Sequence, residues 1–169
     1  SSFEFSKVNH RKVCSGNITF IEHIYSFRGK VNHRYIVIVE EYDYNVFIVK
    51  FCLQNRKVHP DRFNQLTNLF ECSRVLTTVG AIIKSIYDKN PFSSFGFIGS
   101  PLKDEKTENT KRFKLYSRVM MQVISPVLFT HYISTDKSAY LLVNKDNSEK
   151  ELFQKIQKMF NEIYQIEWP

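Results

Sequence analysis

A helix-strand-helix succession over residues 74–118 constrains the fold more than any other part of the sequence. An amphipathic helix comes first, followed by the short apolar strand 95–99 and a second amphipathic helix over 111–120. A strand that carries two glycines between two helices predicts an open sheet with helices packed on it and a close backbone approach at the strand's end. No complete catalytic motif accompanies it in the sequence, so the succession indicates a fold and not a reaction.

The residues before this succession read as a run of strands. β-Branched and aromatic residues fill 18–25, directly after the turn signal Ser15-Gly16-Asn17. Two nearly continuous apolar runs, 35–39 and 46–53, flank the polar stretch 40–45. Such runs are typical of central strands covered on both faces, and the polar stretch between them predicts an antiparallel hairpin.

Helices and strands alternate in the rest of the chain. Ser148 and Glu151 match a capping box ahead of an apolar stripe with helical spacing. After a long loop at 54–68, the predicted elements are a helix over 73–88, the strand 95–99, a helix over 110–124, strands at 129–134 and 139–144 around the turn 135–138, and a helix over 148–165.

This order predicts an α/β (α+β) fold, β-β-β-β-α-β-α-β-β-α, with a mixed, mostly antiparallel twisted sheet and packed helices. At 169 residues and 43% hydrophobic, the chain suits one domain with a core of its own. Within a single domain 1–169, antiparallel strands occupy 1–53, the helix-strand core 54–144 and a C-terminal helix 145–169.

The succession from Tyr35 to Asn144 resembles the core of the GNAT N-acetyltransferase superfamily. Asn109 ahead of a helix that carries Tyr116 is similar to the family segment whose tyrosine protonates the departing thiolate of coenzyme A. The resemblance implies an acyl-CoA-dependent N-acyltransferase with acetyl-CoA as cofactor and Tyr116 as the catalytic acid. The residues alone also predict a core tyrosine, because Tyr116 shares an apolar stripe with Phe113.

One stretch departs from the family pattern. The family holds the cofactor pyrophosphate on a glycine-rich turn before the helix. The corresponding residues 70–80 keep Arg74 but place Val75 and Leu76 where glycines are needed. The chain therefore resembles uncharacterised bacterial or mobile-element relatives that lack the pyrophosphate loop.

Two basic clusters are candidate binding sites. Cations at the start of the predicted helix 110–124 oppose its dipole, which indicates an anion or cofactor site or else a solvated basic face. Basic residues interleaved with an aromatic in the loop 54–68 favour single-stranded nucleic acid, or again only solvation. The first set is Thr110, Lys111, Arg112 and Lys114, to which the acyltransferase alternative adds Arg74 on the phosphate, and the second is Arg56, Lys57, Arg62 and Phe63.

Charge and the remaining reactive residues narrow the function only slightly. The net charge of +7 permits contact with RNA or DNA. Three scattered cysteines predict buried free thiols, and the histidines predict structural roles and no metal site. Glu40, Glu41 and Asp43 fall in a predicted hairpin turn, where we expect them to be exposed.

These observations favour a non-catalytic binding or regulatory module of a bacterial or mobile-element system. We expect it to act in the cytoplasm, without a membrane span and without a cofactor, through a protein partner or its own dimer. Binding of nucleic acid and an N-acyltransferase with a degenerate cofactor site are the two alternatives.

Overall fold

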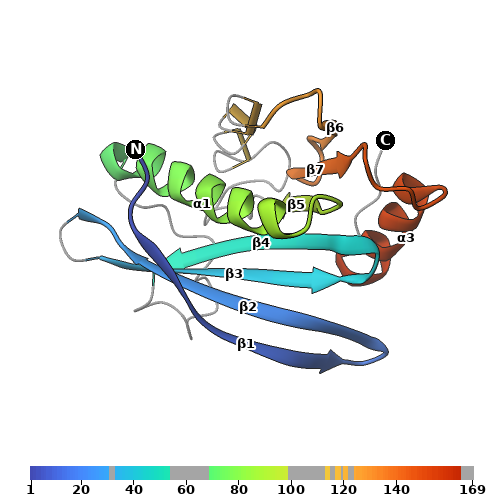
Figure 1. Ribbon diagram of the computed structural model, residues 1–169, viewed down its shortest axis with the longest axis horizontal. Coiled ribbons are helices and arrows are strands. Elements are labelled where there is room, and N and C mark those ends of the chain that lie inside the picture. Colours follow the sequence, from blue (N-terminus) through green and yellow to red (C-terminus); the bar gives the residue numbers. More distant parts are fainter. Residues whose placement is uncertain are drawn as a thin grey trace.

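The computed structural model describes residues 1–30, 33–53, 69–98, 113–114, 117–118, 120–121 and 124–164, with only the backbone of 51–53 and 69–72. Seven strands form one sheet in the order β1-β2-β3-β4-β5-β7-β6, and the α+β class with a mostly antiparallel sheet is confirmed (Figure 1). The elements are β1 (Phe5–Ser15), β2 (Ile18–Arg28), β3 (Arg34–Tyr42), β4 (Val46–Leu53), α1 (Leu69–Lys89), β5 (Ser94–Ile98), β6 (Phe129–Ser134), β7 (Ala139–Asn144) and α3 (Leu152–Tyr164).

Strands β1 to β4 form an antiparallel meander, as their turn signals predict. Gly16 adopts a φ of +61° in the β1–β2 turn, a conformation that glycine reaches without a steric cost. The chain then crosses over through α1 and returns as β5, which pairs with β4 in parallel. Because β5 also pairs with β7, it lies inside the sheet and not at an edge.

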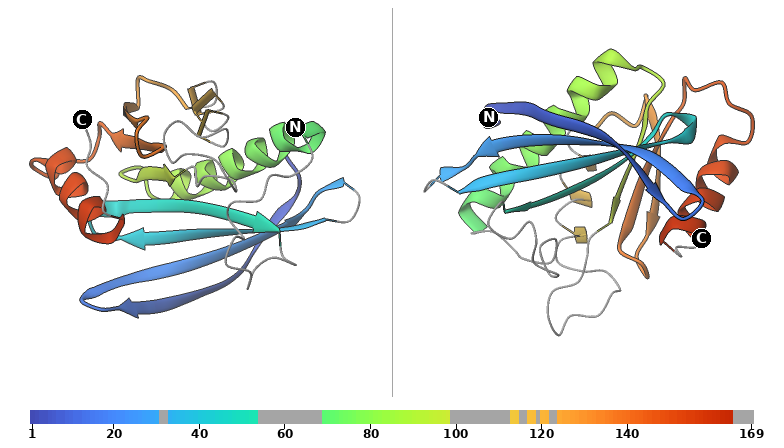
Figure 2. Two further views of the ribbon diagram at one scale, coloured as in Figure 1. Left: turned by 180° about the vertical axis from the view of Figure 1, so that it is seen from behind. Right: turned by 90° about the horizontal axis from the view of Figure 1, so that it is seen from below.

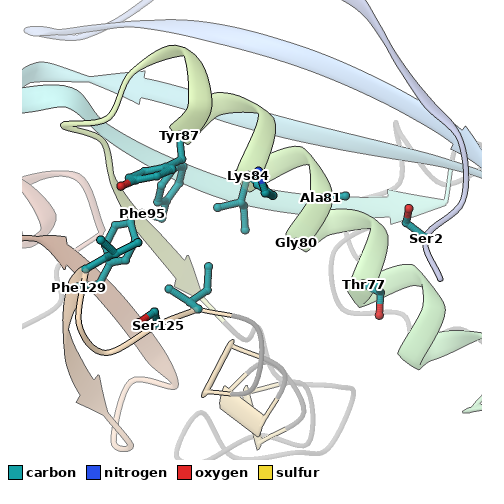
Figure 3. Close-up of a pocket in the computed structure, with 12 residues that line it drawn as sticks. Ser2, Thr77, Gly80, Ala81, Lys84, Tyr87, Phe95, Ser125 and Phe129 are labelled. Atoms are coloured by element: carbon teal, nitrogen blue, oxygen red, sulfur yellow. The ribbon is translucent and has the colours of Figure 1, made fainter.

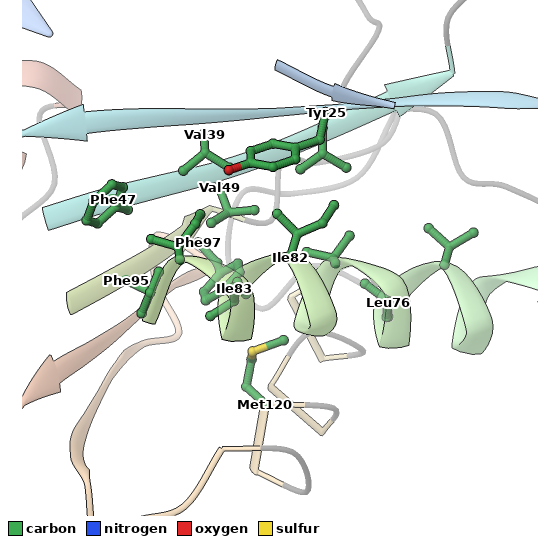
Figure 4. Packing of buried hydrophobic residues seen from close by; sticks show 14 of the residues in the cluster. Tyr25, Val39, Phe47, Val49, Leu76, Ile82, Ile83, Phe95, Phe97 and Met120 are labelled. Atoms are coloured by element: carbon green, nitrogen blue, oxygen red, sulfur yellow. The ribbon is translucent and has the colours of Figure 1, made fainter. Parts of the chain in front are cut away.

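The predicted helix over 110–124 is described only in part. Residues 113–114, 117–118 and 120–121 are helical. Phe113 and Met120 are buried in the same apolar cluster as α1, and Met120 lies on the side of α1 away from the sheet (Figure 4). The described part of this helix therefore packs on α1.

Helices α1 and α3 cover opposite faces of the sheet. Val37, Val39 and Val49 belong to the cluster that contains α1 (Figure 4). Val46 and Ile48 alternate with them and belong to the cluster that contains α3. Since side chains alternate between faces along a strand, this division explains the continuous apolar runs of β3 and β4. Figure 2 shows α3 beside the turn that joins these two strands.

The predicted capping box is wrong. Helix α3 begins at Leu152, and Glu151 has a φ of 53°, which removes it from the first helical turn. The side-chain oxygen of Asn147 accepts a hydrogen bond from the backbone N–H of Glu149 at 2.9 Å. Glu149 in turn forms an ion pair with Lys155. An Asx turn at Asn147 therefore precedes the helix where the sequence pattern favours a serine cap.

Two further expectations about exposure need correction. Cys14 is a free thiol but an exposed one, because it lies on the edge strand β1. Glu40 is buried in β3, whereas the sequence placed it in an exposed turn. The turn is shorter than expected, since β3 extends to Tyr42 and only Asp43–Asn45 connect it to β4. No helix within the described residues is long and apolar enough to cross a membrane.

At Gly96 the helix α3 approaches the backbone of the sheet closely. A Cβ atom at this position would lie 2.6 Å from Cζ of Phe160 and 2.8 Å from Cδ1 of Ile48. The sequence predicted a close backbone approach at the end of this strand, and the structure places it in the middle of β5. The absent side chain therefore makes room for the ring of Phe160, which is almost completely buried.

Gly96→Ala is expected to destabilise the protein, because the added methyl group overlaps Phe160 and Ile48. Overpacking of this kind costs about 1–3 kcal/mol in the free energy of unfolding. In a Phe160→Leu background the penalty of Gly96→Ala should be smaller, since the ring is gone. Chemical denaturation of the four proteins measures this coupling. Equal penalties in the two backgrounds would contradict the contact.

Candidate functional site

Most of the predicted site residues lie outside the described part of the chain. Arg74 and Lys114 are described, and Lys114 is exposed. The residues outside the description are Arg56, Lys57, Arg62, Phe63, Thr110, Lys111, Arg112 and Tyr116.

An apolar pocket of about 370 Å³ lies beside α1. Its α1 wall follows helical spacing, with residues at i, i+3 or i+4, and i+7. Gly80 and Ala81 stand in the middle of this wall (Figure 3), so the helix presents no more than a methyl group there. The α1 residues that line the pocket are Thr77, Gly80, Ala81, Ile83, Lys84 and Tyr87.

Aromatic side chains and the segment before β6 complete the pocket. Tyr87, Phe95 and Phe129 gather at one end of it (Figure 3). The ring centroid of Phe129 lies 5.7 Å from that of Tyr87 and 6.2 Å from that of Phe95. Leu128 also lines the pocket. A ligand in this pocket would therefore meet mostly carbon, with hydroxyl groups and Lys84 at the margins.

Exposed apolar residues lie on the segments next to this pocket, and one of them, Leu128, lines it. Val127 is 76% exposed and Phe92 is 51% exposed. The turn after β7 holds their segments together, because the backbone N–H of Lys145 donates to the carbonyl of Leu128 at 3.0 Å. From the same turn, the amide of Asn147 donates to the carbonyl of Phe92 at 3.1 Å. We call the pocket, together with its exposed lining residue Leu128 and the adjacent Val127, the docking surface.

A second cavity, of about 780 Å³, contains three arginines from three elements. Arg28 ends β2 and Arg34 begins β3, where they are direct cross-strand neighbours. Arg74 comes from α1. One acidic residue, Glu4, also lines the cavity among the described residues, so its walls carry a positive charge. We call this the arginine cavity.

Sequence reasoning found Arg74 but missed the other two arginines. Arg28 lies beyond the strand predicted over 18–25, and Arg34 directly precedes a predicted strand. Their pairing was predictable from hairpin register, because an antiparallel hairpin that turns over 29–33 places residues 28 and 34 opposite each other. The pocket beside α1 was also missed, although two adjacent small residues, Gly80 and Ala81, next to an apolar stripe indicate unfilled space beside that helix.

Glu40 forms the centre of a buried polar cluster on the face that α3 covers. Its carboxylate accepts hydrogen bonds from Tyr164 at 2.6 Å and Tyr42 at 3.2 Å. The ammonium of Lys50 lies 2.9 Å from the same carboxylate and 5.0 Å from the ring centroid of Tyr164. These partners compensate the buried charge, so the cluster ties α3 to the sheet.

Two histidines have defined partners and fill structural positions. Nε2 of His23 lies 2.8 Å from the carboxylate of Glu41, and Nδ1 of His131 is hydrogen-bonded to the hydroxyl of Tyr140. Burial, followed by the charge of Lys145, lowers the pKa of His131. Within the described ranges, no group of three or more histidines, cysteines or acids is arranged to hold a metal ion.

Tyr164→Phe is expected to destabilise the protein by about 1–3 kcal/mol, because Glu40 loses a charge-assisted hydrogen bond in a buried site. Tyr44→Phe removes the same atom from an exposed side chain and should change stability by less than about 0.5 kcal/mol. Urea denaturation of both variants measures the difference. Equal effects would show that the Glu40 cluster does not hold α3.

Alkaline pH is expected to weaken the fold earlier than lysine titration alone would. Burial raises the pKa of Tyr140 from 10.0 to about 12. Burial also raises the pKa of Tyr42 and of Tyr164, and the charge of Glu40 adds to both shifts. Because these tyrosines ionise at a higher pH in the folded than in the unfolded protein, each adds stability to the fold. That contribution is complete below the unfolded pKa of about 10, and it falls as the pH rises above that value. The free energy of unfolding should fall less steeply with pH in Tyr164→Phe than in the parent protein, and identical slopes would contradict this.

Comparison with known proteins gives no relative from which a role could be transferred. The chain matches no family model, and no curated protein or solved structure is significantly similar to it.

Proposed function

We propose that this protein is a non-catalytic binding module and that its docking surface receives a second copy of the chain. The observation that carries this proposal is the combination of an apolar pocket of about 370 Å³ with two exposed apolar residues, Leu128 in its lining and Val127 next to it in the chain. Volumes of about 300–1,000 Å³ are typical of sites that enclose an apolar group. A valine or leucine side chain of a partner fits such a space.

Self-association is supported by an exposed valine that lies next to the apolar pocket. Val127 is largely exposed and adjoins Leu128, which lines the pocket. In a twofold dimer the same patch is used by both copies, so Val127 of each copy can enter the pocket of the other. An exposed apolar patch is unfavourable in water and is stabilised when a partner covers it.

The charges at the margin are compatible with a twofold contact. Lys84 lines the pocket and pairs with Asp88 at 2.8 Å. A twofold axis can place the lysine of one copy against the aspartate of the other, which favours a fixed orientation more than it adds affinity. The polar group of Thr77 is already bonded to the carbonyl of Ser73 at 2.9 Å, so it loses little when the pocket closes.

The two alternatives stay predictions. Binding of nucleic acid by Arg56, Lys57, Arg62 and Phe63 and acyl transfer from acetyl-CoA by Tyr116 both depend on residues outside the described ranges. Neither has a described contact that favours it over the docking surface.

The purified protein is expected to form dimers at micromolar concentration, and Val127→Asp should make it monomeric by placing a charge in the apolar contact. Val8→Asp is the matched control, because Val8 is likewise an exposed valine but lies on β1. Sedimentation velocity across a range of concentrations measures the mass. A monomeric parent protein at about 100 μM, or equal loss of the dimer in both variants, would overturn the proposal.

A further inference from the structure

The arginine cavity holds guanidinium groups that the dimer proposal does not use. Arg34 and Arg74 line it from β3 and α1. They are fixed by different neighbours and approach the cavity from separate elements. Arginine is well suited to oxyanions, because its planar fork of N–H donors matches the oxygens of a phosphate or a carboxylate.

Arg34 is held at the cavity by a buried serine. Nε of Arg34 donates a hydrogen bond to the hydroxyl of Ser26 at 2.9 Å, and Ser26 is buried. This bond uses one of the five N–H donors of the guanidinium. The remaining donors lie on the terminal nitrogens of an exposed side chain, where a ligand can reach them.

Arg74 is held by an aromatic ring. Its guanidinium carbon lies 4.0 Å from the ring centroid of Phe3, and Phe3 stacks on Phe27. The backbone N–H of Phe3 donates to the hydroxyl of Thr78 at 2.8 Å, which fixes Phe3 against α1. Nε of Arg74 is buried and has no hydrogen-bond partner among the described residues. The two terminal nitrogens of Arg74 carry four further N–H donors, with which this cavity-lining side chain can bind an oxyanion.

The third arginine strengthens the field in the cavity. Arg28 and Arg34 are directly paired across β2 and β3, and like charges in such a pair destabilise a hairpin. A sequence that breaks this local rule often does so at a functional position. Among the described residues, one acidic side chain, Glu4, lines the cavity beside the three arginines, so this lining suits an anion better than a neutral ligand.

We propose that the arginine cavity is a binding site for the phosphate group of a small ligand. Arg34 and Arg74 bind its oxygens as forks, and Arg28 adds to the positive field. The volume of about 780 Å³ leaves room for more of the ligand than the phosphate itself. This site is separate from the docking surface, so the two proposals can fail independently.

Isothermal titration of the full chain with inorganic pyrophosphate tests the site, at constant ionic strength and with chloride and sulfate as reference anions. Saturable binding with about one pyrophosphate per chain is expected. Arg34→Gln and Arg74→Gln should each weaken binding by at least about tenfold, because each removes charge-assisted hydrogen bonds. Arg11→Gln is the control, since it removes the same charge from β1, where Arg11 pairs with Glu22 at 2.9 Å.

Each outcome decides the proposal. Thermal unfolding without ligand shows which variants keep their fold, and Arg34→Gln should keep it because that side chain is exposed. Equal loss of binding in Arg11→Gln would mean that pyrophosphate responds only to net charge, which overturns the site. Absence of saturable pyrophosphate binding, or saturable binding that neither Arg34→Gln nor Arg74→Gln weakens, would overturn it as well.

Discussion

Burial of β4 and β5 on both faces is the constraint on which the rest of the structure depends. A strand in the middle of a sheet must have its two rows of side chains covered by different elements. Here α1 covers one row and α3 the other. The crossover through α1 places β5 parallel to β4, and Gly96 lets Phe160 of α3 approach the backbone of β5. Removing either helix would expose one face of the central strands.

Both proposed binding places lie where this packing leaves the helix α1 incompletely covered. Beside Gly80 and Ala81, the helix has no large side chain to fill the space up to Phe95 and Phe129. Near its start, the guanidinium of Arg74 covers the N-terminal segment by stacking on Phe3. One helix therefore contributes a core face toward the sheet, an apolar wall for the docking surface and a cation for the arginine cavity.

Structural elements that depend on residues close together in the sequence were predictable. The apolar runs identified β3 and β4, helical spacing identified α1, and Gly16 marked the first hairpin turn. Contacts between distant residues were not predictable. Burial of Glu40 depends on Tyr164, which is 124 residues away in the sequence. Likewise, Asn147 forms the turn before α3, although Ser148 and Glu151 fit the local capping pattern.

The docking surface is tested most directly by amide hydrogen exchange at two protein concentrations, one below and one above the dissociation constant of the dimer. Exchange reports local opening and burial along the backbone. The account predicts that raising the concentration slows exchange in residues 80–87 and 124–129, which carry the docking surface. Unchanged exchange there, or slower exchange confined to the edge strand β1, would contradict it.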